Sequence, residues 1–148
     1  RAPSPTFKAI GADNVATGSM AGMRLIHALK AALGPRLAVW PFDHVTPGST
    51  GGLAMVLVEI FPSYYFHAAG MNPAKNAAAN PAFMNAALAA YGSEGVGPDY
   101  APRGADADEA DAIISAAALR YFAGRPGCWH APREAAREGW IFGVPPVT

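Results

Sequence analysis

The sequence has a single cysteine, Cys128, among its 148 residues. One thiol cannot close an internal disulfide, so the class of small secreted domains held together by disulfides is excluded. A lone free thiol is typical of a reducing compartment, and we therefore expect a cytoplasmic protein.

Long hydrophobic runs are also missing. The longest, residues 53–61, is interrupted by Glu59, whereas a membrane-spanning helix needs about 20 apolar residues. Hydrophobic residues make up 51% of the chain, but many are alanines, which favour helices and close packing. We therefore expect no membrane partner.

Neither sign of charge is in excess, because 11 Lys and Arg balance 11 Asp and Glu. The chain thus lacks the basic field that marks a dedicated nucleic-acid coat protein. This balance disfavours tight, non-specific binding to a duplex. It is compatible with an enzyme that meets nucleic acid through metal ions, so nucleic acid stays a possible partner.

What the sequence does contain is an alternation of helical and strand patterns within the usual length of one domain, residues 1–148. Apolar residues at helical spacing, closed by glycine or proline, predict helices over 19–33, 63–69, 80–91 and 106–123. Apolar runs predict strands over 37–42, 53–61 and 139–144, the second of them buried on both faces. This order favours an α/β fold with a mixed sheet flanked by helices.

Three acids are candidates for chemistry. Glu59 lies near the end of the predicted buried strand, and Asp108 and Asp111 share one face of a predicted helix because they are three residues apart. If that helix packs near the strand end, the three carboxylates converge, and Mg²⁺ or Mn²⁺ would relieve their repulsion. The structural alternative is that the aspartates only begin a helix, where its dipole favours acids, and that Glu59 lies at the surface.

Other polar residues give weaker signals. Lys75 and Arg103 lie in loops beside the predicted site and could contact phosphate groups, although loop charges are usually only solvated. His44 and His67 are candidate acids or bases because they lie close in sequence to Asp43 and Glu59. The segment Cys128–His130 is too small for a zinc site, which needs about four ligands.

Several of these segments resemble one family. Residues 58–63, Val-Glu-Ile-Phe-Pro-Ser, look like the strand-end signature of predicted nucleases with an RNase H-like fold, a family described only as a domain of unknown function. Residues 108–112 are similar to that family's last acidic helix and to the final helix of RuvC-type junction resolvases. Shorter likenesses lie at residues 7–23, 39–43 and 138–141. The resemblance implies metal-dependent hydrolysis of phosphodiester bonds, with Glu59, Asp108 and Asp111 as catalytic metal ligands.

The chain departs from that family at its beginning. RNase H-like nucleases carry a first aspartate on an opening strand and then a hairpin, whereas here only five residues separate Asp13 from Ser19. We therefore expect an RNase H-like domain that is incomplete at its N-terminus and forms the C-terminal portion of a longer protein. A sheet without its first strands would expose an edge, which a homodimer could cover.

The sequence leaves three functions open. The first is the metal-dependent nuclease, and the second is a non-catalytic RNase H-like module for binding or assembly. The third is an enzyme that handles nucleotides or other small molecules, since a fold alone does not fix a function.

Overall fold

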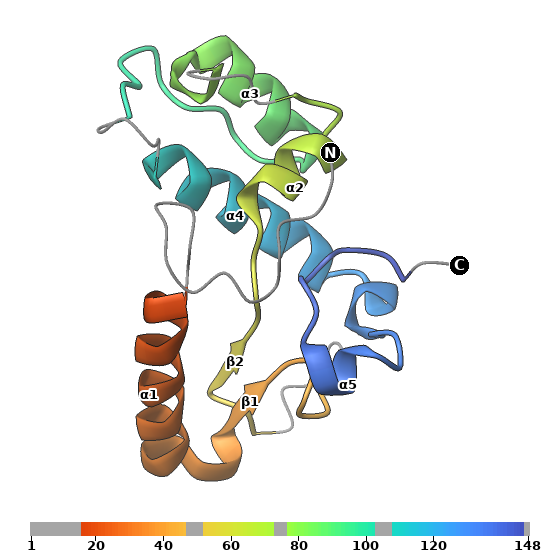
Figure 1. Ribbon diagram of the computed structural model, residues 1–148. Coiled ribbons are helices and arrows are strands. Elements are labelled where there is room, and N and C mark those ends of the chain that lie inside the picture. Colours follow the sequence, from red (N-terminus) through yellow and green to blue (C-terminus); the bar gives the residue numbers. More distant parts are fainter. Residues whose placement is uncertain (1–15, 47–51, 73–76, 103–107, 147–148) are drawn as a thin grey trace.

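The computed structural model describes residues 16–46, 52–72, 77–102 and 108–146. These residues form five α-helices, three short 3₁₀ helices and two short strands (Figure 1). The chain therefore mixes helix and strand around a parallel sheet, as expected for the α/β class. Within these ranges no helix combines the length and the apolar character that a bilayer crossing requires.

The first helix, α1 (Ala16–Leu33), confirms the helix predicted over residues 19–33 and begins three residues earlier. Gly22, Ile26, Leu29 and Leu33 are half-buried along one face, as their helical spacing predicts. The helix ends where Gly34, at φ 55°, takes up a left-handed conformation that favours glycine. The 3₁₀ helix η1 (Gly34–Arg36) then leads into the first strand.

The sheet consists of β1 (Leu37–Val39) and β2 (Met55–Leu57), which pair in parallel with Ala38 opposite Val56. Both strands are shorter than predicted. The predicted strand 37–42 is wrong beyond Val39, because the chain turns there and the Asp43 N–H donates to the Val39 carbonyl at 2.8 Å.

The prediction that residues 53–61 form a strand buried on both faces is also wrong. Met55, Ile60 and Phe61 are 40%, 42% and 50% exposed. The predicted last strand, 139–144, is reduced to a single parallel bridge between Glu59 and Ile141. A strand is buried on both faces only where helices cover both sides of the sheet, and among the described elements α1 is the only helix that packs substantially against a strand.

The remaining helices carry most of the core. They are α2 (Pro62–Ala68), α3 (Pro81–Ala90), α4 (Asp108–Ala123) and α5 (Ala135–Glu138), with η2 (Ala77–Ala79) and η3 (Pro126–Trp129) between them. Helix α4 packs against α2 and α3. The largest fully buried side chains are Tyr65, Phe66, Phe142, Met84, Leu88 and Ile114.

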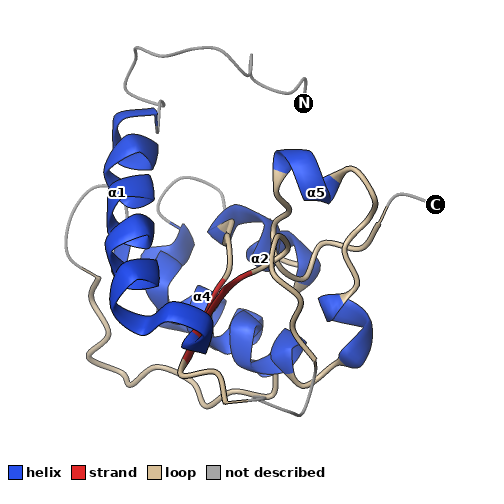
Figure 2. Ribbon diagram, turned by 90° about the horizontal axis from the view of Figure 1, so that it is seen from below, coloured by secondary structure: helices blue, strands red, loops and turns tan. Residues whose placement is uncertain are grey.

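Local signals predicted α2, α3 and α4, whereas α5 was not predicted. Asn80 caps α3 by accepting a hydrogen bond from the Ala82 N–H at 2.9 Å, and Gly92 follows its end at φ 59°. The helix predicted over 106–123 is confirmed from Asp108 onward, and its first two residues lie outside the described ranges. In both ribbon views α1 stands at one side of the molecule, with the strands between it and α5 (Figures 1 and 2).

Candidate functional site

Glu59 is the second residue after β2, and its main chain pairs there with the C-terminal segment, by which we mean the residues after α4, 124–146. Its carbonyl accepts a hydrogen bond from the Phe142 N–H at 3.0 Å. Its carboxylate is exposed and lies over Gly139, because a Cβ built there would be 3.6 Å from Oε2. The carboxylate itself makes no hydrogen bond or ion pair with any residue in the described ranges. The carboxylate is therefore available to a ligand or partner.

Asp108 and Asp111 occupy the first turn of α4, at a different place in the fold. Asp111 is half-buried, and burial together with the nearby charge of Asp108 raises the pKa of its carboxyl. The structure thus brings the two aspartates together, as their spacing predicts. It does not add Glu59 to them, because no group of three or more His, Cys, Asp or Glu side chains in the described ranges could hold a metal ion.

The packing of α4 explains this separation. Its main contacts are with α2, α3 and η3, and neither strand is among them. Lys75 and Arg103, the predicted phosphate contacts, lie outside the described residues.

A crevice opens at the carboxyl ends of the two parallel strands, where ligands of open α/β sheets commonly bind. Its volume is about 370 Å³, within the usual range for small ligands. Strand-end residues, the first turns of α1 and the segment around Trp140 line it. Its wall is largely apolar and includes Met23, Ile26 and Phe42 together with Glu59.

Both indole N–H groups at the crevice are already used. Trp40 donates to the Trp129 carbonyl at 3.1 Å, and Trp140 donates to the Val144 carbonyl at 2.9 Å. The indoles therefore offer ring surface only. Among the described residues that line the crevice, Glu59 is the only one with an ionisable side chain, so the crevice suits an apolar group that carries a positive charge.

A shallower hollow on α1 adjoins the crevice and is lined by Met20, Met23, Arg24 and His27. Met23 lines both hollows, which makes them one continuous surface. Arg24 makes no ion pair within the part of the chain that the structure describes. Large apolar side chains surround it, since Met20, Met23 and Leu25 are 54%, 61% and 60% exposed.

Sequence reasoning found Glu59 but missed Arg24, Phe42 and Trp140. The helical pattern of residues 19–33 placed Leu25 on the buried face, whereas it is exposed. A signal existed in Met20, Met23 and Leu25, which are too many apolar residues for a single buried stripe. Comparison of the chain with family models, with curated proteins and with solved structures found no match.

Proposed function

We propose that this chain is a non-catalytic assembly module that binds a second copy of itself. The surface involved, here called the assembly face, consists of the crevice at the strand ends and the exposed side of α1. The observation that carries this proposal is a pair of unmatched charges on one apolar surface, the Glu59 carboxylate and the Arg24 guanidinium.

Twofold symmetry makes such a surface self-complementary. In a symmetric dimer the same patch serves both subunits, so Arg24 of one copy meets Glu59 of the other, and the contact occurs twice. Met20, Met23 and Leu25 would then be covered. Exposed apolar patches of this kind commonly mark interaction sites. The charge pair would fix the orientation of the two copies, and apolar burial would supply most of the affinity.

Charge exchange tests this arrangement. We expect a dimeric mass for the native chain by light scattering, and monomers for Arg24→Glu and for Glu59→Arg, because each change places like charges opposite one another. The double variant Arg24→Glu, Glu59→Arg restores the pair and should dimerise again. Arg36→Glu and Glu134→Arg, at exposed positions away from this face, are the matched controls.

A native chain that stays monomeric at working concentration would overturn the proposal. So would a double variant that remains monomeric while its melting temperature is unchanged.

The second candidate is the metal-dependent phosphodiester hydrolase of RNase H-like fold, using Mg²⁺ or Mn²⁺. Its expected metal ligands are Glu59, Asp108 and Asp111, of which the described structure brings together only the two aspartates. The observation in its favour is the pair of carboxylates in the first turn of α4. Burial, and after it the charge of Asp108, raises the pKa of Asp111, and a cation would stabilise both ionised groups. The position of Glu59 at the carboxyl end of a parallel strand also supports the fold family.

Calorimetry with Mn²⁺ separates this candidate from the first. Binding that is lost in both Glu59→Gln and Asp111→Asn would support one shared metal site and justify nuclease assays. Absence of Mn²⁺ binding by the native chain would count against the hydrolase and leave the assembly module unaffected.

A further inference from the structure

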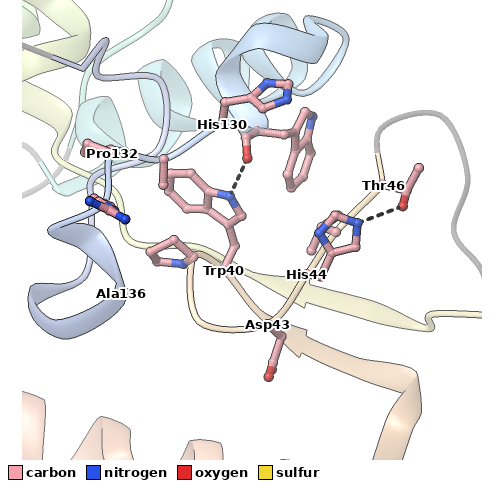
Figure 3. A pocket seen from close by; sticks show the side chains of 12 residues that line it. Trp40, Asp43, His44, Thr46, His130, Pro132 and Ala136 are labelled. Atoms are coloured by element: carbon pink, nitrogen blue, oxygen red, sulfur yellow. Dashed lines mark hydrogen bonds between the residues drawn. The ribbon is translucent and has the colours of Figure 1, made fainter. Parts of the chain in front are cut away.

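A second cavity, separate from the assembly face, lies on the other side of Trp40 and Pro41. We call it the indole pocket; its volume is about 430 Å³. The turn after β1 forms one wall and residues 129–133 of the C-terminal segment form the other, so the fold brings together segments almost ninety residues apart (Figure 3).

Two tryptophans make the pocket rigid and aromatic. Trp40 is only 4% exposed, and its ring packs edge-on against Phe142 with the centroids 5.1 Å apart. Trp129 packs against the same phenyl ring at 4.7 Å and donates its indole N–H to the Ala123 carbonyl at 3.0 Å. With its N–H group occupied, the half-buried indole of Trp129 presents apolar ring surface to the pocket, which favours a flat aromatic ligand, whereas Trp40 is almost fully buried and contributes only an edge.

Asp43 is the only acid among the described residues that line the pocket, and its carboxylate is paired with Lys30. Asp43 accepts hydrogen bonds from the Lys30 ammonium at 2.5 Å and from the Val39 N–H at 2.8 Å. The hydrogen bond from Lys30, followed by that from Val39, lowers the pKa of its carboxyl and keeps it ionised. Figure 3 shows its carboxylate pointing away from Trp40. Asp43 therefore contributes no free negative charge to the pocket.

The other ionisable groups in the lining are His44, His130 and Arg133. Arg133 makes no ion pair with any described residue. Thr46 Oγ1 lies 3.4 Å from His44 Nε2, so its hydroxyl is on the same side of Trp40 as the His44 imidazole (Figure 3). A guanidinium, two imidazoles and a hydroxyl together supply donors suited to a phosphate or a carboxylate group.

We propose that the indole pocket binds a planar aromatic ring that bears an anionic group. The ring packs on the indole of Trp129 beside the edge of Trp40, and the anion is held by Arg133 with one of the two imidazoles, His44 or His130, which lie on different sides of the tryptophans (Figure 3). A phosphate or a carboxylate would satisfy this chemistry. The net charge of the whole chain is zero, so the selectivity for an anion is local to this pocket.

Nuclear magnetic resonance provides a direct test, because the chain has three tryptophans and only Trp40 and Trp129 line the pocket. The probes are adenosine monophosphate, indole-3-acetate, adenosine and inorganic phosphate. We expect the indole N–H signals of Trp40 and Trp129 to shift with adenosine monophosphate or indole-3-acetate, while that of Trp140 stays in place. Tighter binding of adenosine monophosphate would indicate a preference for phosphate, and tighter binding of indole-3-acetate a preference for carboxylate.

Adenosine and inorganic phosphate each lack half of the recognised chemistry and should bind at least about tenfold more weakly. Arg133→Ala should weaken binding by a similar factor, whereas Arg137→Ala, exposed on α5 and outside the pocket, should not change it. No shift with either aromatic anion would overturn the proposal, and so would equal affinity in the Arg133→Ala and Arg137→Ala variants.

Discussion

Tyr65 and Tyr91 show how single residues tie the core to the rest of the chain. Tyr65 has no exposed surface, and its hydroxyl donates to the Phe142 carbonyl at 2.9 Å. The Tyr91 hydroxyl in turn donates to the Tyr65 carbonyl at 2.5 Å. These two hydrogen bonds join α2 to the C-terminal segment and to the end of α3.

The two phenols predict a loss of stability in alkali. Burial raises the pKa of Tyr65 and of Tyr91 to about 12, above the ordinary value of about 10. The folded chain therefore favours the neutral phenols, and this contribution is complete below about pH 10 and is lost as the pH rises toward 12. We expect the melting temperature to fall steeply across that interval.

The double variant Tyr65→Phe, Tyr91→Phe provides the control for the alkaline effect. It should be less stable at neutral pH, by roughly 1 kcal/mol for each lost hydrogen bond. Its melting temperature should fall less steeply above pH 10. A fall as steep as that of the native chain would show that other groups, such as lysines, cause it.

At the scale of elements, Arg120 in the last turn of α4 forms hydrogen bonds to the C-terminal end of α3. Its guanidinium donates to the carbonyls of Tyr91 and Gly92 at 2.9 and 2.7 Å, and to the Ser93 hydroxyl at 3.0 Å. The last carbonyls of a helix have no partner within it, so an arginine on a neighbouring helix stabilises both elements.

Arg120→Ala should therefore lower the free energy of unfolding by about 1–2 kcal/mol, because these carbonyls lose a charged donor. Urea denaturation measures this difference. Arg137→Ala, at an exposed position on α5, should stay within about 0.5 kcal/mol of the native chain. Equal effects of the two substitutions would contradict the role given to Arg120.

Helices could be predicted from the sequence because their ends depend on nearby residues. Asn80, Pro81 and Gly92 mark α3 without reference to the rest of the fold. Strand length was overestimated because it depends on a distant partner: residues 53–61 are apolar throughout most of their length, yet only Met55–Leu57 find an extended strand to pair with.

The same distinction applies to the candidate sites: residues close in sequence could be predicted to lie together, and residues far apart could not. The pairing of Asp108 with Asp111 follows from helical spacing and was predicted. The indole pocket could not be predicted, because no local pattern relates His44 to His130 or Trp40 to Trp129. Such pairs become visible only when the C-terminal segment is placed against the turn after β1.

For the whole molecule, α1 is the least supported of the long helices. Among the described elements its main contacts are with β1 and η1, and three of its large apolar side chains are exposed. Elements with few buried contacts open first in the native state. The proposed dimer would supply the contacts that α1 lacks.

Amide hydrogen exchange should therefore depend on protein concentration in α1 but not in α4. Raising the concentration favours the dimer by mass action and should slow exchange in residues 16–33. The Arg24→Glu variant should exchange rapidly in α1 at every concentration. Concentration-independent exchange in the native α1 would argue against a dimer that covers this helix.

Trp40 and Pro41 line both the crevice and the indole pocket, so a single wall two residues long separates them. A group bound in either cavity therefore contacts the same two residues. Thermodynamic linkage requires reciprocity: if dimerisation changes the affinity for an aromatic anion by some factor, the anion changes the dimerisation constant by that same factor.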